Sequence, residues 1–70
     1  MTITIGFIGA GNMASALVGG LLARGHQAQN FALADAQPAQ LVGFKEQGLF
    51  TTANNADVFE RANVIVLAVK

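Results

Sequence analysis

The sequence predicts an α/β fold in which helices cover both faces of a parallel sheet. Short apolar runs typical of strands alternate along the chain with stretches of helical periodicity. The last of these runs, residues 64–69, contains no polar residue, which is typical of a strand buried on both faces of a parallel sheet. Because crossovers between parallel strands are right-handed, this alternation predicts a doubly wound sheet.

The first strand and the first helix meet at a glycine-rich turn. Residues 2–8 are β-branched or apolar and lead directly into glycine, which predicts a buried strand. The helix begins at Asn12 or Met13 and ends near Arg24, where Gly25 can cap it. Its apolar positions recur at spacings of three and four and predict a core-facing stripe: Met13, Ala16, Leu17, Gly20 and Leu21.

A second strand and helix follow. Residues 31–34 form a short apolar run closed by Asp35, and Pro38 occupies the expected first turn of the helix. This helix ends at Gly48, and its core residues are Leu41 and Phe44.

The third strand and helix lead to the last strand. Residues 49–52 predict a brief strand, and Asn54 or Asn55 can cap the helix after it. We expect that helix to bury Val58, Phe59 and Ala62. The run at 64–69 then predicts a strand in the middle of the sheet.

Composition restricts the partners of the chain. Of its 70 residues, 53% are hydrophobic and 11% are charged. We therefore expect exposed apolar surface that more chain or another subunit would cover. Scattered single basic residues argue against nucleic acid. Without a long apolar run or a signal peptide, the expectation is a soluble, cytoplasmic protein with no membrane partner. With no cysteine and one histidine, His26, we expect no metal site and a solvated imidazole.

Residues 9–14, Gly9-Ala10-Gly11-Asn12-Met13-Ala14, fit the pattern G-x-G-x-x-G/A between a strand and a helix. Gly9 would permit the tight turn, Gly11 would let a pyrophosphate approach the backbone, and Ala14 would allow close packing of the helix. The helix N-terminus adds N–H groups and partial positive charge. In isolation such a pattern can be only a turn. Its context predicts a Rossmann-type site for the pyrophosphate of a nicotinamide cofactor.

Asp35 lies about 20 positions beyond this loop, where a carboxylate can accept hydrogen bonds from the adenosine ribose hydroxyls. It can equally be a turn residue ahead of Pro38. No arginine occurs between Asp35 and Arg61, so the residues favour NAD over NADP. Asn54 and Asn55 can either contact adenosine or cap a helix.

The remaining features of the sequence are two glycines inside the first helix and a few polar residues that could act in catalysis. Gly19 and Gly20 each cost about 1 kcal/mol relative to alanine inside a helix, and close packing is the expected compensation. No catalytic residue is predicted. None of the candidates has a partner at a spacing typical of acid-base or nucleophilic catalysis, and all of them fit helix surfaces or caps better: Ser15, Glu46, Asp57 and Glu60.

Residues 5–14, 19–21 and 67–70 resemble the N-terminal domain of pyrroline-5-carboxylate reductase, and the resemblance spans the whole chain. Hydroxyisobutyrate and 6-phosphogluconate dehydrogenases and deazaflavin-dependent NADP reductases share the opening stretch. The ending Ala68-Val69-Lys70 distinguishes the reductase family. The resemblance implies the last step of proline biosynthesis, in which NADPH or NADH reduces the imine of 1-pyrroline-5-carboxylate to L-proline.

The resemblance also assigns cofactor contacts. Pyrophosphate contacts fall on Ile8, Gly9, Ala10, Gly11, Asn12 and Met13. Contacts to adenosine fall on Asp35 and Asn55, and contacts near the nicotinamide ribose on Ala68, Val69 and Lys70.

The chain departs from the reductase family in two ways. Asp35-Ala36-Gln37 stands where NADPH-preferring members carry a hydroxyl or basic residue, which leaves NADP(H) or NAD(H) open. The helical domain that supplies substrate binding and the dimer is missing. Residues 1–70 are therefore expected to be the N-terminal part of the NAD(P)-binding domain of a homo-oligomeric enzyme, inactive alone. The alternatives are a nucleotide-binding module or an inactive fragment of a related reductase, of the hydroxy-acid dehydrogenase or deazaflavin-dependent type.

Overall fold

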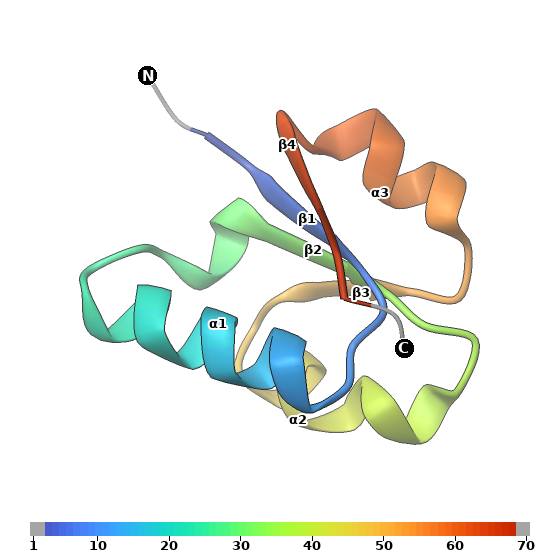
Figure 1. The fold of residues 1–70 in the computed structure, drawn as a ribbon, viewed down its shortest axis with the longest axis horizontal. Helices are drawn as coiled ribbons and strands as arrows, with labels where there is room; N and C mark the ends of the chain where they lie inside the picture. The colour runs from blue at the N-terminus through green and yellow to red at the C-terminus, as the bar shows by residue number, and fades with distance from the viewer. Residues whose placement is uncertain (1–2, 69–70) are drawn as a thin grey trace.

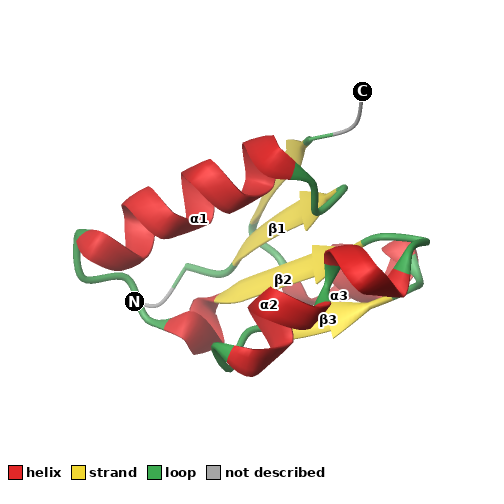
Figure 2. Ribbon diagram, turned by 90° about the horizontal axis from the view of Figure 1, so that it is seen from below, coloured by secondary structure: helices red, strands yellow, loops and turns green. Residues whose placement is uncertain are grey.

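A four-stranded parallel sheet forms the centre of the computed structural model, which describes residues 3–68. The strands are β1 (Ile5–Ile8), β2 (Phe31–Ala34), β3 (Phe50–Thr52) and β4 (Val64–Leu67), in the spatial order β3-β2-β1-β4 (Figures 1 and 2). β1 pairs with β2 on one side and with β4 on the other. The predicted alternating α/β order and parallel sheet are confirmed.

Helices cover both faces of this sheet. α1 (Asn12–Ala23) and α2 (Val42–Glu46) pack on one face, where their residues join Phe7 and Leu33 in the larger apolar core. α3 (Asn55–Arg61) packs on the opposite face. The two faces make the fold doubly wound, as predicted. Within residues 3–68, no helix has the length and apolar character needed to cross a membrane.

The core consists of alternate strand residues that point to opposite faces, as the pleat requires. On the α1 and α2 face, Phe7, Phe31 and Leu33 contact residues of both helices, including Ala14, Val18 and Phe44. On the α3 face, Ile8, Ala32 and Ala34 surround Val58. Gly6 is buried on this second face, where the absence of a side chain lets α3 approach the backbone of β1.

The C-terminus of α1 has the cap that the sequence predicts. Gly25 adopts φ +101°, a conformation that favours glycine. Its N–H donates to the carbonyl of Leu22, and the N–H of His26 donates to that of Leu21, both at 3.1 Å. This pair of bonds is a Schellman motif, which satisfies carbonyls that the helix leaves free. His26 is exposed, as expected.

The predicted second helix is divided into two parts. Pro38 begins a short 3-10 turn, η2 (Pro38–Gln40), and α2 starts only at Val42. The N–H groups of Gln40 and Leu41 donate to carbonyls three residues back, at 3.0 and 2.9 Å, so this turn is wound more tightly than an α-helix. Another short 3-10 turn, η1 (Ala28–Asn30), leads into β2.

The predicted buried stripe of α1 is wrong at four positions, whereas Leu21 packs against the core as expected; the four exposed positions are Met13, Ala16, Leu17 and Gly20. The helix buries Ala14 and Val18, whereas Met13 is 58% exposed and Leu17 is also exposed. Gly19 and Gly20 are exposed too, and no atom lies within 4 Å of a Cβ atom built on either, so the expected close packing is absent from residues 3–68. Two neighbouring stripes of α1 are both apolar, and periodicity alone does not distinguish between them.

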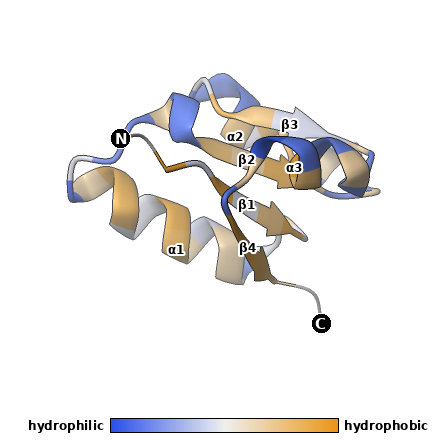
Figure 3. Ribbon diagram, turned by 90° about the horizontal axis from the view of Figure 1, so that it is seen from above, coloured by the Kyte–Doolittle hydropathy of each residue, from blue (hydrophilic) through white to orange (hydrophobic). Residues whose placement is uncertain are grey.

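The predicted positions of β4 and Phe59 are also wrong. β4 lies at the edge of the sheet that residues 3–68 form, and Leu67 is 68% exposed. In the described part of the chain no strand lies beyond it, and apolar colouring extends along β4 and α1 in Figure 3. Phe59 is 57% exposed because α3 turns Val58, rather than Phe59, toward the sheet.

Candidate functional site

The loop after β1 makes the tight turn that the glycine pattern predicts. Gly9 adopts φ +100°, which a residue with a Cβ atom rarely tolerates. Its N–H donates to the carbonyl of Ala34 at 2.8 Å, so the loop is tied to the end of β2. On the other side, the N–H of Ala68 donates to the carbonyl of Ile8 at 2.8 Å. The loop therefore starts from a fixed position between two strands.

Gly11 precedes α1 and leaves the start of the helix open. It is the N-cap residue, in extended conformation with φ −84° and ψ −156°, and a Cβ atom built on it would have no atom within 4 Å. Because glycine has no side chain to cap the helix, the N–H groups of the first turn are available to an external acceptor. Ala14 is fully buried one turn later, which confirms the close packing predicted for this position.

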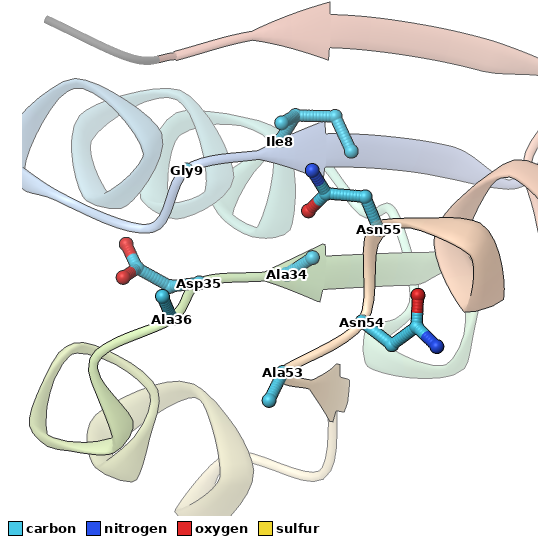
Figure 4. A pocket seen from close by; sticks show the side chains of 8 residues that line it. All are labelled: Ile8, Gly9, Ala34, Asp35, Ala36, Ala53, Asn54 and Asn55. Atoms are coloured by element: carbon cyan, nitrogen blue, oxygen red, sulfur yellow. The ribbon is translucent and has the colours of Figure 1, made fainter.

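Two pockets open at the carboxyl ends of the strands, on either side of Gly9 and Asp35. The larger, of about 700 Å³, lies between the loops that follow β1, β2 and β3, as Figure 4 shows. The second, of about 440 Å³, extends from Gly9 over the start of α1 and includes Asn12, Met13 and Ala68. In doubly wound sheets ligands bind at this edge. The structure thus gathers most of the predicted contact residues around these two pockets, which share Gly9 and Asp35 and are together called the opening below.

Asp35 connects the second strand to the glycine loop. One carboxylate oxygen, Oδ2, accepts a hydrogen bond from the N–H of Ala10, and Oδ1 accepts one from the N–H of Gln37, each at 2.9 Å. The bond to Gln37 closes the turn ahead of Pro38, so the turn interpretation of Asp35 is confirmed. The carboxylate also contributes to both pockets, and the ribose interpretation stays a prediction.

The two asparagines after β3 have different positions. Asn54 caps α3, because its Oδ1 accepts the N–H of Ala56 at 2.9 Å. Thr52 stabilises the beginning of α3, because its hydroxyl oxygen accepts the N–H of Asn54 and its hydroxyl donates to Oδ2 of Asp57 at 2.7 Å. In Figure 4 the side chain of Asn55 leans into the larger pocket toward Ile8, whereas that of Asn54 points away. Asn55 is thus left available to a ligand.

The predicted residues do not all lie at the opening in the same way. Ala10 is buried, and its N–H is already engaged by Asp35. Ala68 is buried beside the second pocket. Val69 and Lys70 lie outside the described residues.

Several pocket residues were not predicted from the sequence. Gln37 and Gln40 line the second pocket, and Ala34, Ala36 and Ala53 line the larger one. Most of them occur at or just after the ends of β2 and β3. That position is the signal that could have identified them, since their residue types carry none.

Charge in the opening is sparse and negative. Of the described residues that line the two pockets, Asp35 alone carries a charge. Arg61, the next arginine along the chain, lies over the ring of Phe50 with its guanidinium carbon 3.6 Å from the ring centroid. This stacking is a cation–π contact and occupies the guanidinium away from the two pockets. The opening therefore offers backbone N–H groups and neutral side chains to a ligand, together with one carboxylate.

Residues 4–70 match the family described as NADP oxidoreductase coenzyme F420-dependent. A pyrroline-5-carboxylate reductase from Vibrio alginolyticus is 45% identical over 67 residues, which cover 94% of this chain and 25% of that protein. One from Pseudomonas aeruginosa is 42% identical over an alignment of 72 residues, covering 99% of this chain and 26% of that protein.

Comparison with solved structures gives a similar result. A pyrroline-5-carboxylate reductase from Coxiella burnetii superposes with a TM-score of 0.92 and 38% identity, over 99% of this chain and 26% of that one. An imine reductase variant from Myxococcus stipitatus, in complex with NAD+, gives a TM-score of 0.81 and 28% identity, over 99% of this chain and 23% of that one. This chain spans about a quarter of the length of the relatives that it matches. It belongs to the family described as NADP oxidoreductase coenzyme F420-dependent, and its resemblance to pyrroline-5-carboxylate reductase is confirmed.

Proposed function

We propose that this chain is the NAD(P)H-binding part of an oxidoreductase that reduces 1-pyrroline-5-carboxylate to L-proline. The observation that carries the proposal is the open space at Gly11, where the tight turn at Gly9 exposes the start of α1 between two pockets. A backbone that leaves this space free can receive a pyrophosphate at the helix N-terminus. The names of the relatives and their sequence identity to this chain support this choice of substrate.

Different residues around the opening would bind different parts of the cofactor. The first turn of α1 and the residues from Ile8 to Met13 would hold the pyrophosphate. Asp35 and Asn55 face the larger pocket, which would receive adenosine. Ala68, Val69 and Lys70 would contact the nicotinamide ribose. The nicotinamide ring supplies the hydride when it is bound, and this part of the protein contributes binding and orientation.

The preference between NADH and NADPH forms part of the same proposal. Asp35 would accept hydrogen bonds from the ribose hydroxyls of NADH and repel the 2′-phosphate of NADPH. The described residues that line these two pockets contain no cation to offset that repulsion, and the nearest candidate, Lys45, lines a separate pocket on the other side of Asp35. We therefore propose that this chain binds NADH more tightly than NADPH.

We propose that residues 1–70 form the first part of the NAD(P)-binding domain, and that a further domain binds the substrate and mediates homo-oligomerisation. The relatives support this division, because three-quarters of their length has no counterpart in this chain. We propose cytoplasmic localisation for the whole enzyme.

A titration of NADH and of NADPH into the 70-residue chain tests the cofactor assignment. The fluorescence of the reduced nicotinamide reports the binding of either cofactor, because it is excited at wavelengths that the protein does not absorb. We expect saturable binding of at least one cofactor. A chain that is folded by circular dichroism and binds neither would refute the assignment. Proline formation by a longer protein that contains this chain tests the substrate.

A further inference from the structure

We infer that Asp35 is a positioning residue for the phosphate-binding loop, in addition to any contact with ribose. The inference rests on the proposed function, because the loop matters only if a dinucleotide binds there. Its structural basis is the hydrogen bond from the N–H of Ala10 to Oδ2 of Asp35 at 2.9 Å. Ala10 lies between Gly9 and Gly11, at the centre of the turn that a pyrophosphate would approach.

The contact is well placed to hold the loop. Ala10 is 2% exposed, so its N–H would lack a partner in a buried environment if the carboxylate were removed. A charged acceptor makes this bond stronger than one between neutral groups. The second oxygen of Asp35 is held by the N–H of Gln37, which fixes the direction of the carboxylate toward the loop. One side chain thus joins two separate loops at the mouth of the site.

Other bonds limit how far the loop can relax without Asp35. The N–H of Gly9 donates to the carbonyl of Ala34, and the N–H of Ala68 donates to the carbonyl of Ile8, both at 2.8 Å. These backbone bonds do not involve the carboxylate. The loss of Asp35 should therefore release the stretch around Ala10 while the end of β1 stays in place.

This arrangement couples ribose recognition to the phosphate site. A carboxylate oxygen can accept more than one hydrogen bond, so Asp35 can bind a ribose hydroxyl while it still holds Ala10. A 2′-phosphate beside the same carboxylate would repel it, and any displacement of Asp35 would loosen the loop. Discrimination against NADPH would therefore weaken the binding of its pyrophosphate as well as of its ribose.

The decisive experiment compares wild type with Asp35→Ala in the full 70-residue chain, using NADH and its analogue that lacks both adenosine ribose hydroxyls. If Asp35 positions the loop, the variant should bind the analogue roughly fivefold more weakly, because the lost contact is internal to the protein. Amide hydrogen exchange in the free protein should accelerate at Ala10 and stay unchanged at Gly9. Glu60→Gln, which removes an exposed carboxylate from α3, is the matched control for charge and should change neither readout.

Two results would each overturn the inference. Equal affinity of wild type and Asp35→Ala for the analogue would limit Asp35 to the ribose. Unchanged exchange at Ala10 would show that the carboxylate does not hold the loop. If Asp35→Ala does not fold, Asp35→Leu, which keeps the approximate size of the side chain and removes both acceptor oxygens, carries the same two tests. A wild-type chain that binds neither ligand refutes the proposed cofactor site instead, and the exchange of Ala10 still reports on the contact.

Discussion

A Cβ atom on Gly6 would lie 2.5 Å from Cγ1 of Val58 and 2.7 Å from the Cβ of Ala62, so α3 rests directly on the backbone of β1. We expect Gly6→Ala to force these elements apart and to lower the free energy of unfolding by about 1–3 kcal/mol. Urea denaturation followed by circular dichroism measures this loss.

Gly20→Ala is the matched control for that substitution. A Cβ atom on Gly20 meets no atom within 4 Å, and the residue lies in the interior of α1. Alanine there should raise the free energy of unfolding by about 0.5–1 kcal/mol through helix propensity. Similar losses in both variants would show that α3 does not depend on the missing side chain of Gly6.

Substitution of Gly11 should separate binding from folding. Gly11→Ala places a methyl group in open space, so we expect the stability to change by less than about 1 kcal/mol. The same methyl group obstructs the approach of pyrophosphate, and cofactor affinity should fall at least about tenfold, or about 1.4 kcal/mol. Gly11→Val should abolish binding. Titration of NADH checks both variants, and wild-type affinity in a folded Gly11→Val protein would exclude a pyrophosphate at this loop.

Asp35→Ser should shift the cofactor preference. Removal of the carboxylate eliminates its repulsion of a 2′-phosphate and its acceptance of ribose hydroxyls, so affinity for NADPH relative to NADH should rise by roughly tenfold. The ratio of the two dissociation constants is the proper readout, because a loosened loop weakens both cofactors. A constant ratio would leave Asp35 with no part in recognition of the ribose.

Asn54 and Asn55 should respond differently to the same change. Asn54→Ala removes the cap of α3 and should cost about 1 kcal/mol of stability with little effect on NADH affinity. Asn55→Ala removes a side chain that faces the larger pocket, so it should weaken NADH binding severalfold while stability is nearly constant. Thermal unfolding and titration of both variants measure the two effects. The opposite pattern would assign the ligand contact to Asn54.

Local signals explain what the sequence alone can predict about this molecule. The turn at Gly9, the cap at Gly25 and β2 at residues 31–34 each depend on neighbouring residues and agree with the structure. The sequence left open whether Asn54 or Asn55 caps α3, because the choice depends on the exact residue at which the helix begins.

Tertiary contacts determine the features that could not be predicted. Met13 and Ala14 are adjacent and both apolar, and only the position of the sheet decides that Ala14 is buried. The bond between Asp35 and Ala10 joins residues 25 positions apart, which no spacing rule relates. β4 has the continuous apolar run typical of a strand in the middle of a sheet, yet among residues 3–68 it lies at the edge, because the position of a strand depends on which other strands pair with it.

The parallel pairing of β1 has a consequence for the order in which this molecule folds. Ile5 pairs with Phe31 on one side and with Val64 on the other, and no hairpin brings either partner near. Such distant contacts require large loops to close before they contribute stability, which slows folding. Because β2 and β4 both anchor the end of β1, the loop at Gly9 acquires its final shape only when nearly the whole chain has assembled. A dinucleotide that binds only this final shape of the loop would therefore stabilise the entire folded sheet.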